Sequence, residues 1–437
     1  RPPIKFCLSY FFDITDKKKP KQLRDLNFEG YYANSRMIGD YVYFVTNNYN
    51  YYYQDNEPII PRVLENDKET TKGCAGQANA KCVLPDVYYF DMSYQSYNFT
   101  AVTAINVKNN SETINQDIYL LSDSQNMNVS QNNIYITYPK YISEYQLYME
   151  VMKEIVFPLL TSKDKTKISK IEQTDEAVLT KEEKMQKIST IIYIYRQSLS
   201  DEAQDKLEEM VEEKMKAKYQ DISKELEKTV IHKIAIDKNN LTYKATGEVT
   251  GEVLNQFSMD EDSGYFRIAT TKNQTWSQYL DASSTQSYNN LYVLDSDLKI
   301  VGKIEDLAKG EKIYSTRFMQ NRAYMVTFEQ IDPLFVIDVK DPKNPKVLGK
   351  LKIPGFSNYL HPYDDTTLIG LGKDTTTTSW GGVRTKGIKL SLFDVADVSS
   401  PKEINSYIMG GSGSDSIALQ DHKAFLFSKD KNLLTIP

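Results

Sequence analysis

The sequence predicts an all-β fold, a β-propeller that carries an α-helical insertion. Three observations predict it: a turn motif that recurs along the chain, a hairpin pattern that follows it, and one charge-rich helical stretch that interrupts both. The composition agrees, because the 437 residues include 32 Tyr and are 40% hydrophobic, and Tyr, Thr, Val and Ile favour the half-buried surface of a pleated sheet. A chain of this length also exceeds what one small core usually holds. We therefore expect a large repeated architecture.

The turn motif has the spacing Asp-x-x-Asp-x-x-x-Pro. In each copy an apolar run ends at the first Asp, the second Asp can accept backbone amides of the turn, and Pro restricts φ before the chain enters another alternating strand. The copies are "FFDITDKKKPKQLRDL" from Phe11, "FVIDVKDPKNPKVLGKL" from Phe335 and "LFDVADVSSPKEINSY" from Leu392. The motif predicts a strand, a turn and a second strand in each copy.

A second recurring element consists of an alternating strand, a polar turn of a few residues and an aromatic or aliphatic strand, which is the pattern of a β-hairpin. It occurs as "NSRMIGDYVYFVTN", "NMNVSQNNIYITYP", "LNQFSMDEDSGYFRIATT", "YSTRFMQNRAYMVTFE", "SNYLHPYDDTTLIGLGK" and "DSIALQDHKAFLFSK". Four short strands in each unit of about 45 to 55 residues describe propeller blades rather than a β-sandwich. We expect seven or eight blades in the complete protein, about six of them recognisable here.

The third hairpin contains three consecutive acids, Asp260, Glu261 and Asp262. We interpret them as an acidic hairpin turn that ends at Gly264, because the sister hairpins carry unrelated polar residues at this place. The alternative is a metal site, since carboxylate oxygens suit calcium, but the alternating Asp pattern of a dedicated calcium loop is missing. Apart from calcium at these acids, no cofactor is expected.

A helical segment divides the blades. Residues 141–230 are expected to form the insertion, with blades before it in 1–140 and after it in 231–437. Apolar residues share one face between 201 and 228, and "TKEE" from Thr180 to Glu183 has the pattern of a capping box. The insertion is either a pair of solvated helices packed on each other or an arm for binding a partner, and both interpretations remain open.

The net charge of −6 argues against a nucleic-acid binder, because phosphate recognition needs a concentrated cationic face. No apolar run reaches the roughly 18 to 20 residues of a membrane span. Because the sequence begins with Arg1 rather than Met, we expect a processed N-terminus or one that continues upstream, with any signal peptide outside this sequence.

Cysteines and sequons are compatible with export. Cys74 and Cys82 are predicted to form a local disulfide that closes a loop, with two reduced thiols as the alternative, and Cys7 would then be unpaired or bonded elsewhere. Candidate N-glycosylation sites are Asn98, Asn109, Asn128, Asn240 and Asn273. About four such sequons are expected by chance in a chain this rich in Asn, Ser and Thr, so their number alone does not establish export.

No constellation of catalytic residues is recognisable. The three histidines, His232, His361 and His422, stand in no metalloprotease frame, and we interpret the last two as structural or surface residues of turns. A P-loop, a nucleophile elbow and a dinucleotide fingerprint are absent from the sequence. We read the glycine-rich stretch 410–416 as a blade connection. A non-enzymatic role is therefore favoured, although the sequence does not decide it.

The chain resembles a family of secreted archaeal and bacterial proteins whose β-propeller domain is distantly related to WD40 repeats. The strongest matches are "SRMIGDYVYFV", "VLNQFSMDEDSGYFRIATT", "FVIDVKDPKNPKVLGKLKIPGFSNYLHPYDD", "LSLFDVADVSSPKEI" and "DSIALQDHKAFLF". Helical material before "IHKIAI" is also typical of this family. The resemblance implies export, usually with an N-terminal signal or anchor, and it implies no reaction.

The resulting prediction is an extracellular or cell-surface propeller that acts as a binding, adhesion or surface-assembly module. Its partners would be a protein or glycan at the cell surface, with a homo-oligomer or lattice as a further form, and the loop 47–81 is the first expected contact surface. The rival hypothesis is a secreted hydrolase or carbohydrate-active propeller, which needs carboxylates about 5 to 10 Å apart at the ring axis. A third alternative, an intracellular interaction hub, predicts reduced cysteines and no glycans.

Overall fold

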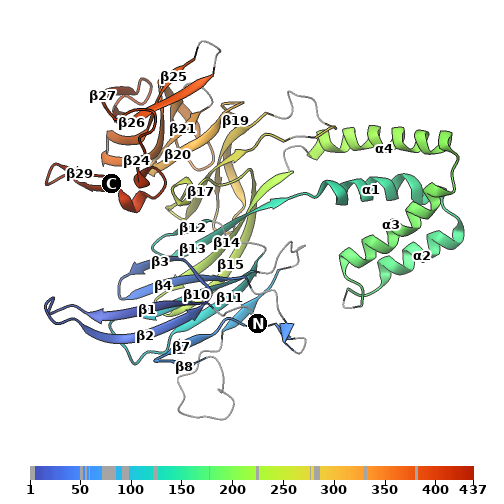
Figure 1. Ribbon diagram of the computed structural model, residues 1–437, viewed down its shortest axis with the longest axis horizontal. Helices are drawn as coiled ribbons and strands as arrows, with labels where there is room; N and C mark the ends of the chain where they lie inside the picture. The colour runs from blue at the N-terminus through green and yellow to red at the C-terminus, as the bar shows by residue number, and fades with distance from the viewer. Residues whose placement is uncertain are drawn as a thin grey trace.

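The computed structural model shows a body of antiparallel sheets and a helical arm (Figure 1). The residues it describes are 5–49, 53–54, 57–58, 60–70, 85–90, 98–121, 126–176, 178–222, 226–275, 277–279, 286–328, 332–378 and 382–437. Six sheets of four or five strands follow one another along the chain, and a two-stranded sheet follows the sixth. The predicted β-propeller is therefore confirmed as the fold class, and we number these six sheets blades 1 to 6.

The first two blades contain strands far apart in sequence. Blade 1 consists of β1 (Phe6–Asp13), β2 (Lys21–Glu29), β7 (Val63–Glu65) and β8 (Lys68–Glu69). Blade 2 consists of β3 (Tyr31–Ile38), β4 (Tyr41–Asn48), β10 (Asn98–Asn106), β11 (Asn115–Leu121) and β9 (Asp86–Tyr88), and β9 pairs with β11 in parallel. A small hairpin of β5 (Tyr53–Gln54) and β6 (Glu57–Pro58) stands apart from both.

Blades 3 to 6 each place four strands side by side in chain order. Blade 3 is β12 (Asn126–Val129), β13 (Asn133–Tyr141), β14 (Glu227–Asp237) and β15 (Asn240–Thr250); blade 4 is β16 (Met259–Asp262), β17 (Tyr265–Lys272), β18 (Tyr288–Leu294) and β19 (Ile300–Leu307). Blade 5 is β20 (Lys312–Met319), β21 (Arg322–Phe328), β22 (Asp332–Asp338) and β23 (Lys346–Ile353); blade 6 is β24 (Phe356–Asp364), β25 (Thr367–Thr377), β26 (Val383–Asp394) and β27 (Lys402–Met409). The final pair is β28 (Leu426–Ser428) and β29 (Leu433–Thr435).

The Asp-x-x-Asp-x-x-x-Pro motif forms a turn between two antiparallel strands, as predicted, and in blades 5 and 6 these are the third and fourth strands. In blade 5, Asp338 accepts the backbone N–H of Lys340 at 2.9 Å and Asp341 accepts that of Lys343 at 3.0 Å. Asp394 and Asp397 make the same bonds in blade 6. These side chains replace ladder bonds that the turning backbone cannot make. The first copy forms the same turn between β1 and β2.

In blades 5 and 6 this turn packs against the blade before it. The carbonyl oxygen of Pro342 lies over Gly302 of β19, where an added Cβ would be only 2.1 Å away, and that of Val398 lies over Gly349 of β23, where the distance would be 2.2 Å. Glycine is needed here because no side chain fits between the two backbones. The repeated motif therefore also sets the packing between neighbouring blades.

The hairpin with three acids corrects one sequence-based prediction. Asp260, Glu261 and Asp262 were expected in its turn, but they form strand β16, paired with β17. The turn is Ser263-Gly264, whose φ angles of 51° and 82° belong to a type I′ hairpin. Because two residues close the hairpin, the acids stay in the ladder.

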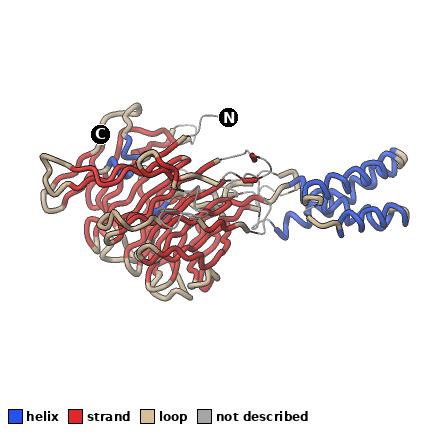
Figure 2. Tube along the Cα trace, turned by 90° about the horizontal axis from the view of Figure 1, so that it is seen from below, coloured by secondary structure: helices blue, strands red, loops and turns tan. Residues whose placement is uncertain are grey.

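The helical arm lies between β13 and β14, which pair as far as Tyr141 and Glu227. It contains α1 (Glu144–Val156), the short helix η1 (Phe157–Leu159), α2 (Ser162–Gln173), α3 (Lys181–Gln197) and α4 (Asp201–Ile222). It projects from the strand body (Figure 2). The predicted capping box is present, since Thr180 Oγ1 accepts the N–H of Glu183 while Glu183 accepts that of Thr180. Among the described residues, no helix is both long and apolar enough to cross a bilayer.

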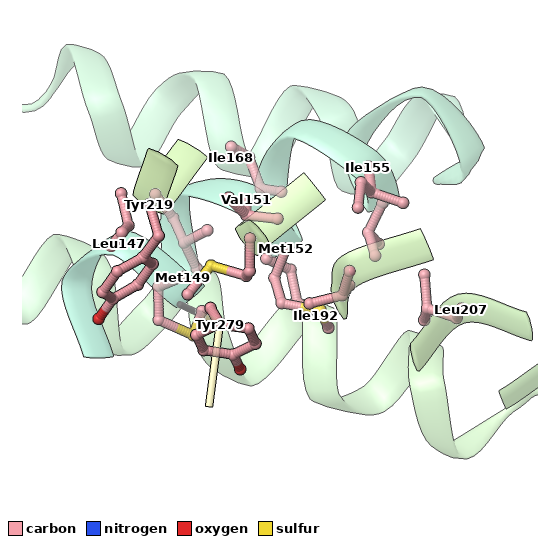
Figure 3. Close-up of a cluster of buried hydrophobic side chains, with 14 of the residues drawn as sticks. Leu147, Met149, Val151, Met152, Ile155, Ile168, Ile192, Leu207, Tyr219 and Tyr279 are labelled. Carbon is pink, nitrogen blue, oxygen red and sulfur yellow. The ribbon is translucent and has the colours of Figure 1, made fainter. Parts of the chain in front are cut away.

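The arm has a hydrophobic core of its own (Figure 3). The apolar face predicted for α4 contributes Leu207, Val211, Met215 and Tyr219, all buried. Tyr279, from the connection between β17 and β18, also enters this core and packs on Tyr219 with ring centres 5.4 Å apart. The arm is therefore attached to the propeller at two places, the β13–β14 stem and the segment around Tyr279.

Candidate functional site at the ring axis

A cavity of about 450 Å³ lies where the inner strands of several blades meet. Residues 32–36 of β3, Asn126 and Met127 of β12, and Asn255 and Gln256 line it, together with residues 421–423 near the C-terminal end. Blades 2, 3 and 4 and the segment after blade 6 thus share one axial space. Such a concave space at the meeting point of several elements is the default position for a binding site.

His422 joins this cavity to an aromatic cluster. It opens the short helix η5 (His422–Ala424), and Gln256 Nε2, in the short helix η2 (Gln256–Ser258), lies 3.2 Å from its Nε2 atom. Phe257 meets the imidazole edge-on with ring centres 4.8 Å apart. Tyr359 of β24 packs on Phe257 at 5.4 Å, and its hydroxyl lies 3.0 Å from Nδ1 of His361. Blades 4 and 6 and the C-terminal segment therefore supply one continuous aromatic cluster.

Arg317 of β20 places a cation against this stack. Its guanidinium carbon lies 5.0 Å from the ring centre of Phe257, in a cation–π arrangement. Among the described residues, nothing forms an ion pair or a hydrogen bond with this half-buried guanidinium. Burial lowers the pKa of Arg317, while Tyr359 and Asp260 oppose that shift. Among the described residues, the contact of this guanidinium, which carries five N–H donors, is therefore with the ring face of Phe257.

The surroundings of the two axial histidines favour their neutral forms, because they lower the pKa of both side chains. Burial lowers the pKa of His361, and the charge of Arg317 lowers it further. Burial also lowers the pKa of His422; Asp421 opposes the shift, whereas Lys423 and Arg317 add to it. The positive charge of the site at neutral pH therefore comes from Arg317 and from Arg36 and Lys423, both exposed in the cavity wall.

Comparison with known proteins agrees with this architecture. The profile of a family described as "Beta propeller domain" matches residues 7–437. This chain belongs to that β-propeller family. It is 32% identical over 429 residues to an uncharacterized protein of Methanocaldococcus jannaschii, covering 98% of this chain and 62% of that protein. An uncharacterized protein of Archaeoglobus fulgidus is 31% identical over 419 residues, or 95% of this chain and 60% of that protein. The chain thus spans about three fifths of the length of these relatives.

The three acids predicted as a metal site all have protein partners in this propeller. Asp260 Oδ2 accepts Nε of Arg267 at 2.9 Å, and Asp262 lies 3.7 Å from the same guanidinium. Glu261 instead accepts Nδ2 of Asn133 at 2.8 Å and the hydroxyl of Ser130. Within the described part of the chain, no three His, Cys, Asp or Glu side chains gather as metal ligands would. Calcium binding at these acids stays a prediction, and the geometry offers no common ligand point.

The other predicted positions are scattered. Asn98 is fully buried, and the Nδ2 atoms of Asn128 and Asn273 already donate to Met259 O and to two glutamates. Asn109 and Asn240 are exposed. Cys7 is a free, partly buried thiol. Cys74, Cys82 and about half of the loop 47–81, including residues 71–81, lie outside the described residues. The loop's residues 63–65 and 68–69 form β7 and β8 of blade 1.

One histidine corrects the sequence-based interpretation. His361 was expected in a turn, but it lies within strand β24 and pairs with Ile369, because Pro362 is tolerated on this edge strand. His422 faces the axial cavity. His232 is buried in blade 3 between the hydroxyls of Tyr138, at 3.2 Å, and Tyr243, at 3.0 Å. Arg317 and Phe257 carried no local signal, because isolated residues in ordinary hairpins resemble all the others.

Proposed function

We propose that this propeller is an extracytoplasmic binding module that recognises its ligand at the ring axis and catalyses no reaction. The observation that carries the proposal is Arg317, an unpaired cation on Phe257 beside a polar cavity. A protein usually pairs a desolvated charge, because isolated burial is costly. A rigid ring that presents such a group on its axis is suited to hold a ligand there.

The rival hydrolase hypothesis requires two converging carboxylates. Among the described residues that line the cavity, Asp421 is the one carboxylate, and its Oδ1 accepts the N–H of Lys423 at 2.9 Å. In strand β16, Asp260 is paired with Arg267, and Glu261 accepts hydrogen bonds from Ser130 and Asn133. This arrangement favours binding over general acid catalysis.

The cell-surface location is part of the proposal. The exposed sequons at Asn109 and Asn240 are the two positions with an accessible acceptor nitrogen, so glycans are expected there if the protein is exported. Adhesion or assembly would use the arm, where Tyr193, Ile194 and Met210 are exposed at 61%, 63% and 53%. Intact mass before and after deglycosylation and reduction tests export, because an intracellular hub would show neither glycans nor disulfides.

The binding function is tested with isolated cell envelopes of the source organism. The purified protein should co-sediment with them, and the double substitution Arg36→Gln and Lys423→Gln in the cavity wall should reduce the bound fraction. Arg384→Gln is the matched control, because Arg384 is exposed near the tip of the β25–β26 hairpin. If the double variant sediments like the wild type, the axial site is not the recognition site. If the protein instead released a cleaved product from the envelopes, and the Asp421→Asn variant did not, the hydrolase hypothesis would be favoured.

A further inference from the structure

The axial site differs in charge from the rest of the molecule. The chain has a net charge of −6, yet Arg36 and Lys423 line the cavity with Asp421 as the single carboxylate among its described lining. Arg317 lies beside this cavity on Phe257, the residue that follows the lining Gln256. None of these three cations has an ion pair within the described residues. A local excess of positive charge in a concave site attracts anions, because low-dielectric walls focus the field.

We propose that the axial site binds an acidic saccharide, with the sugar carboxylate received by the guanidinium of Arg317. This inference rests on the proposed binding function and specifies the ligand class. The wall cations Arg36 and Lys423 would stabilise further carboxylates of the same chain.

The carboxylate assignment follows from the geometry of Arg317. A guanidinium offers two parallel N–H groups that match a planar carboxylate, whereas a lysine offers a point charge. Phe257 lies against the guanidinium at 5.0 Å and so restricts its orientation. With no protein acceptor among the described residues, these donors remain available for a ligand.

The saccharide assignment follows from the neighbours of Arg317. Asn34, Ser35, Asn126, Asn255 and Gln256 give the cavity wall hydroxyl and amide groups, which match the hydroxyls of a sugar. Tyr32, which lines the cavity and is 45% exposed, supplies a ring face that can pack on the C–H face of a pyranose. A nucleic acid fits less well, because phosphate-based binding relies on many cations along a face and the chain is acidic overall.

The axial histidines make this binding dependent on pH. An anion beside His361 and His422 offsets the charge of Arg317, which now lowers the pKa of both imidazoles. Ligand binding therefore raises both pKa values, and by linkage the affinity increases as the pH falls through the pKa values of the ligand-bound histidines. A neutral saccharide would show no such increase.

The test is calorimetric titration of the purified chain with trigalacturonate and with a hyaluronan tetrasaccharide, each compared with its methyl ester. We expect at least one acid to bind about tenfold or more tightly than its ester, since hydrogen bonds to charged groups contribute about 1.5 to 3 kcal/mol. Arg317→Met should abolish this preference, Arg317→Lys should retain part of it, and Arg384→Gln should bind as the wild type does. Circular dichroism shows whether each variant is folded.

Should Arg317→Met fail to fold, the pair Arg36→Gln and Lys423→Gln at the exposed wall provides the same comparison. The inference is overturned if both acids bind no better than their esters, or if a folded Arg317→Met variant keeps the preference. In that case, if the double substitution in the cavity wall still reduces co-sedimentation with envelopes, the proposed binding function stands. If the double substitution leaves co-sedimentation unchanged, the proposed binding function is itself contradicted.

Discussion

The α-carbon of Gly302 in blade 4 lies directly beneath the carbonyl oxygen of Pro342 in blade 5. A Cβ at this position would come within 2.1 Å of that oxygen and 2.9 Å of Pro345 Cδ. Gly349 and Val398 repeat the relationship between blades 5 and 6. The proline-containing turn of one blade thus packs on a glycine of the blade before it. The two blades can pack this closely because glycine has no side chain.

Gly302→Ala should therefore destabilise the propeller by about 2 to 4 kcal/mol, because a backbone carbonyl cannot yield as a flexible side chain does. Urea denaturation followed by circular dichroism measures the change. Gly413→Ala is the control, since an added Cβ there meets nothing within 4 Å. Equal stability of the two variants would show that the blades can separate to admit the methyl group.

His232 should make stability fall in acid. Burial lowers the pKa of His232 from 6.5 to about 4, so between these values the unfolded chain binds a proton that the native state does not. Stability is retained above pH 6.5 and lost as the pH falls toward 4, by on the order of 3 kcal/mol. His232→Gln should flatten this part of the stability curve relative to the wild type. If the stability of the variant falls with pH as steeply as that of the wild type, other groups cause the acid sensitivity.

Asp117 should make stability change with pH in the opposite direction from His232. Burial raises the pKa of Asp117 from 3.8 to about 6, against the hydrogen bond that it accepts from Tyr119 Oη at 3.1 Å. The native state binds the extra proton between these values, so the ionised carboxylate destabilises the fold as the pH rises through 6. Asp117→Asn should gain up to about 3 kcal/mol at pH 8 and nothing at pH 3.5. Urea denaturation of the variant and the wild type at both pH values measures this difference in the free energy of unfolding. A variant that is less stable than the wild type at pH 8 would contradict the prediction.

The root of the arm contains a buried ion pair. Lys272 Nζ lies 3.6 Å from Glu227 Oε2, and both side chains are about 5% exposed. Lys272→Met should cost about 3 to 5 kcal/mol, because it leaves a buried carboxylate without a counter-charge. The double substitution Lys272→Met and Glu227→Met should recover most of this loss in thermal unfolding. If the double variant is as unstable as the single one, packing rather than charge is responsible.

Local sequence patterns predicted many elements correctly. The turn around Asp341, the capping box at Thr180 and Glu183, and the buried face of α4 all formed as expected, because each depends on residues within one or two turns of chain. Asp260 to Asp262 and His361 were wrongly assigned to turns. In both cases the strand continues because its ladder partners, far along the chain, extend the pairing.

The candidate site could not be predicted in this way. Arg317, Phe257, Tyr359 and His422 come from four separate segments, and they meet because the inner strands of several blades converge on one axis. A hairpin pattern reports which residues alternate between faces, but it carries no information on which inner strand lies opposite another.

The sequence by itself determined the repeat, the hairpins, the turn chemistry and the helical character of the insertion between β13 and β14, since these follow from local hydrogen bonding and periodicity. Only the tertiary structure decided which residues of the repeated turns are buried. Val339 and Val395 follow the first Asp of their motifs and are buried at 4% and 0% exposure, whereas Ile14 at the same motif position is 63% exposed. Identical local rules give different burial, because burial depends on which neighbouring blade covers the turn.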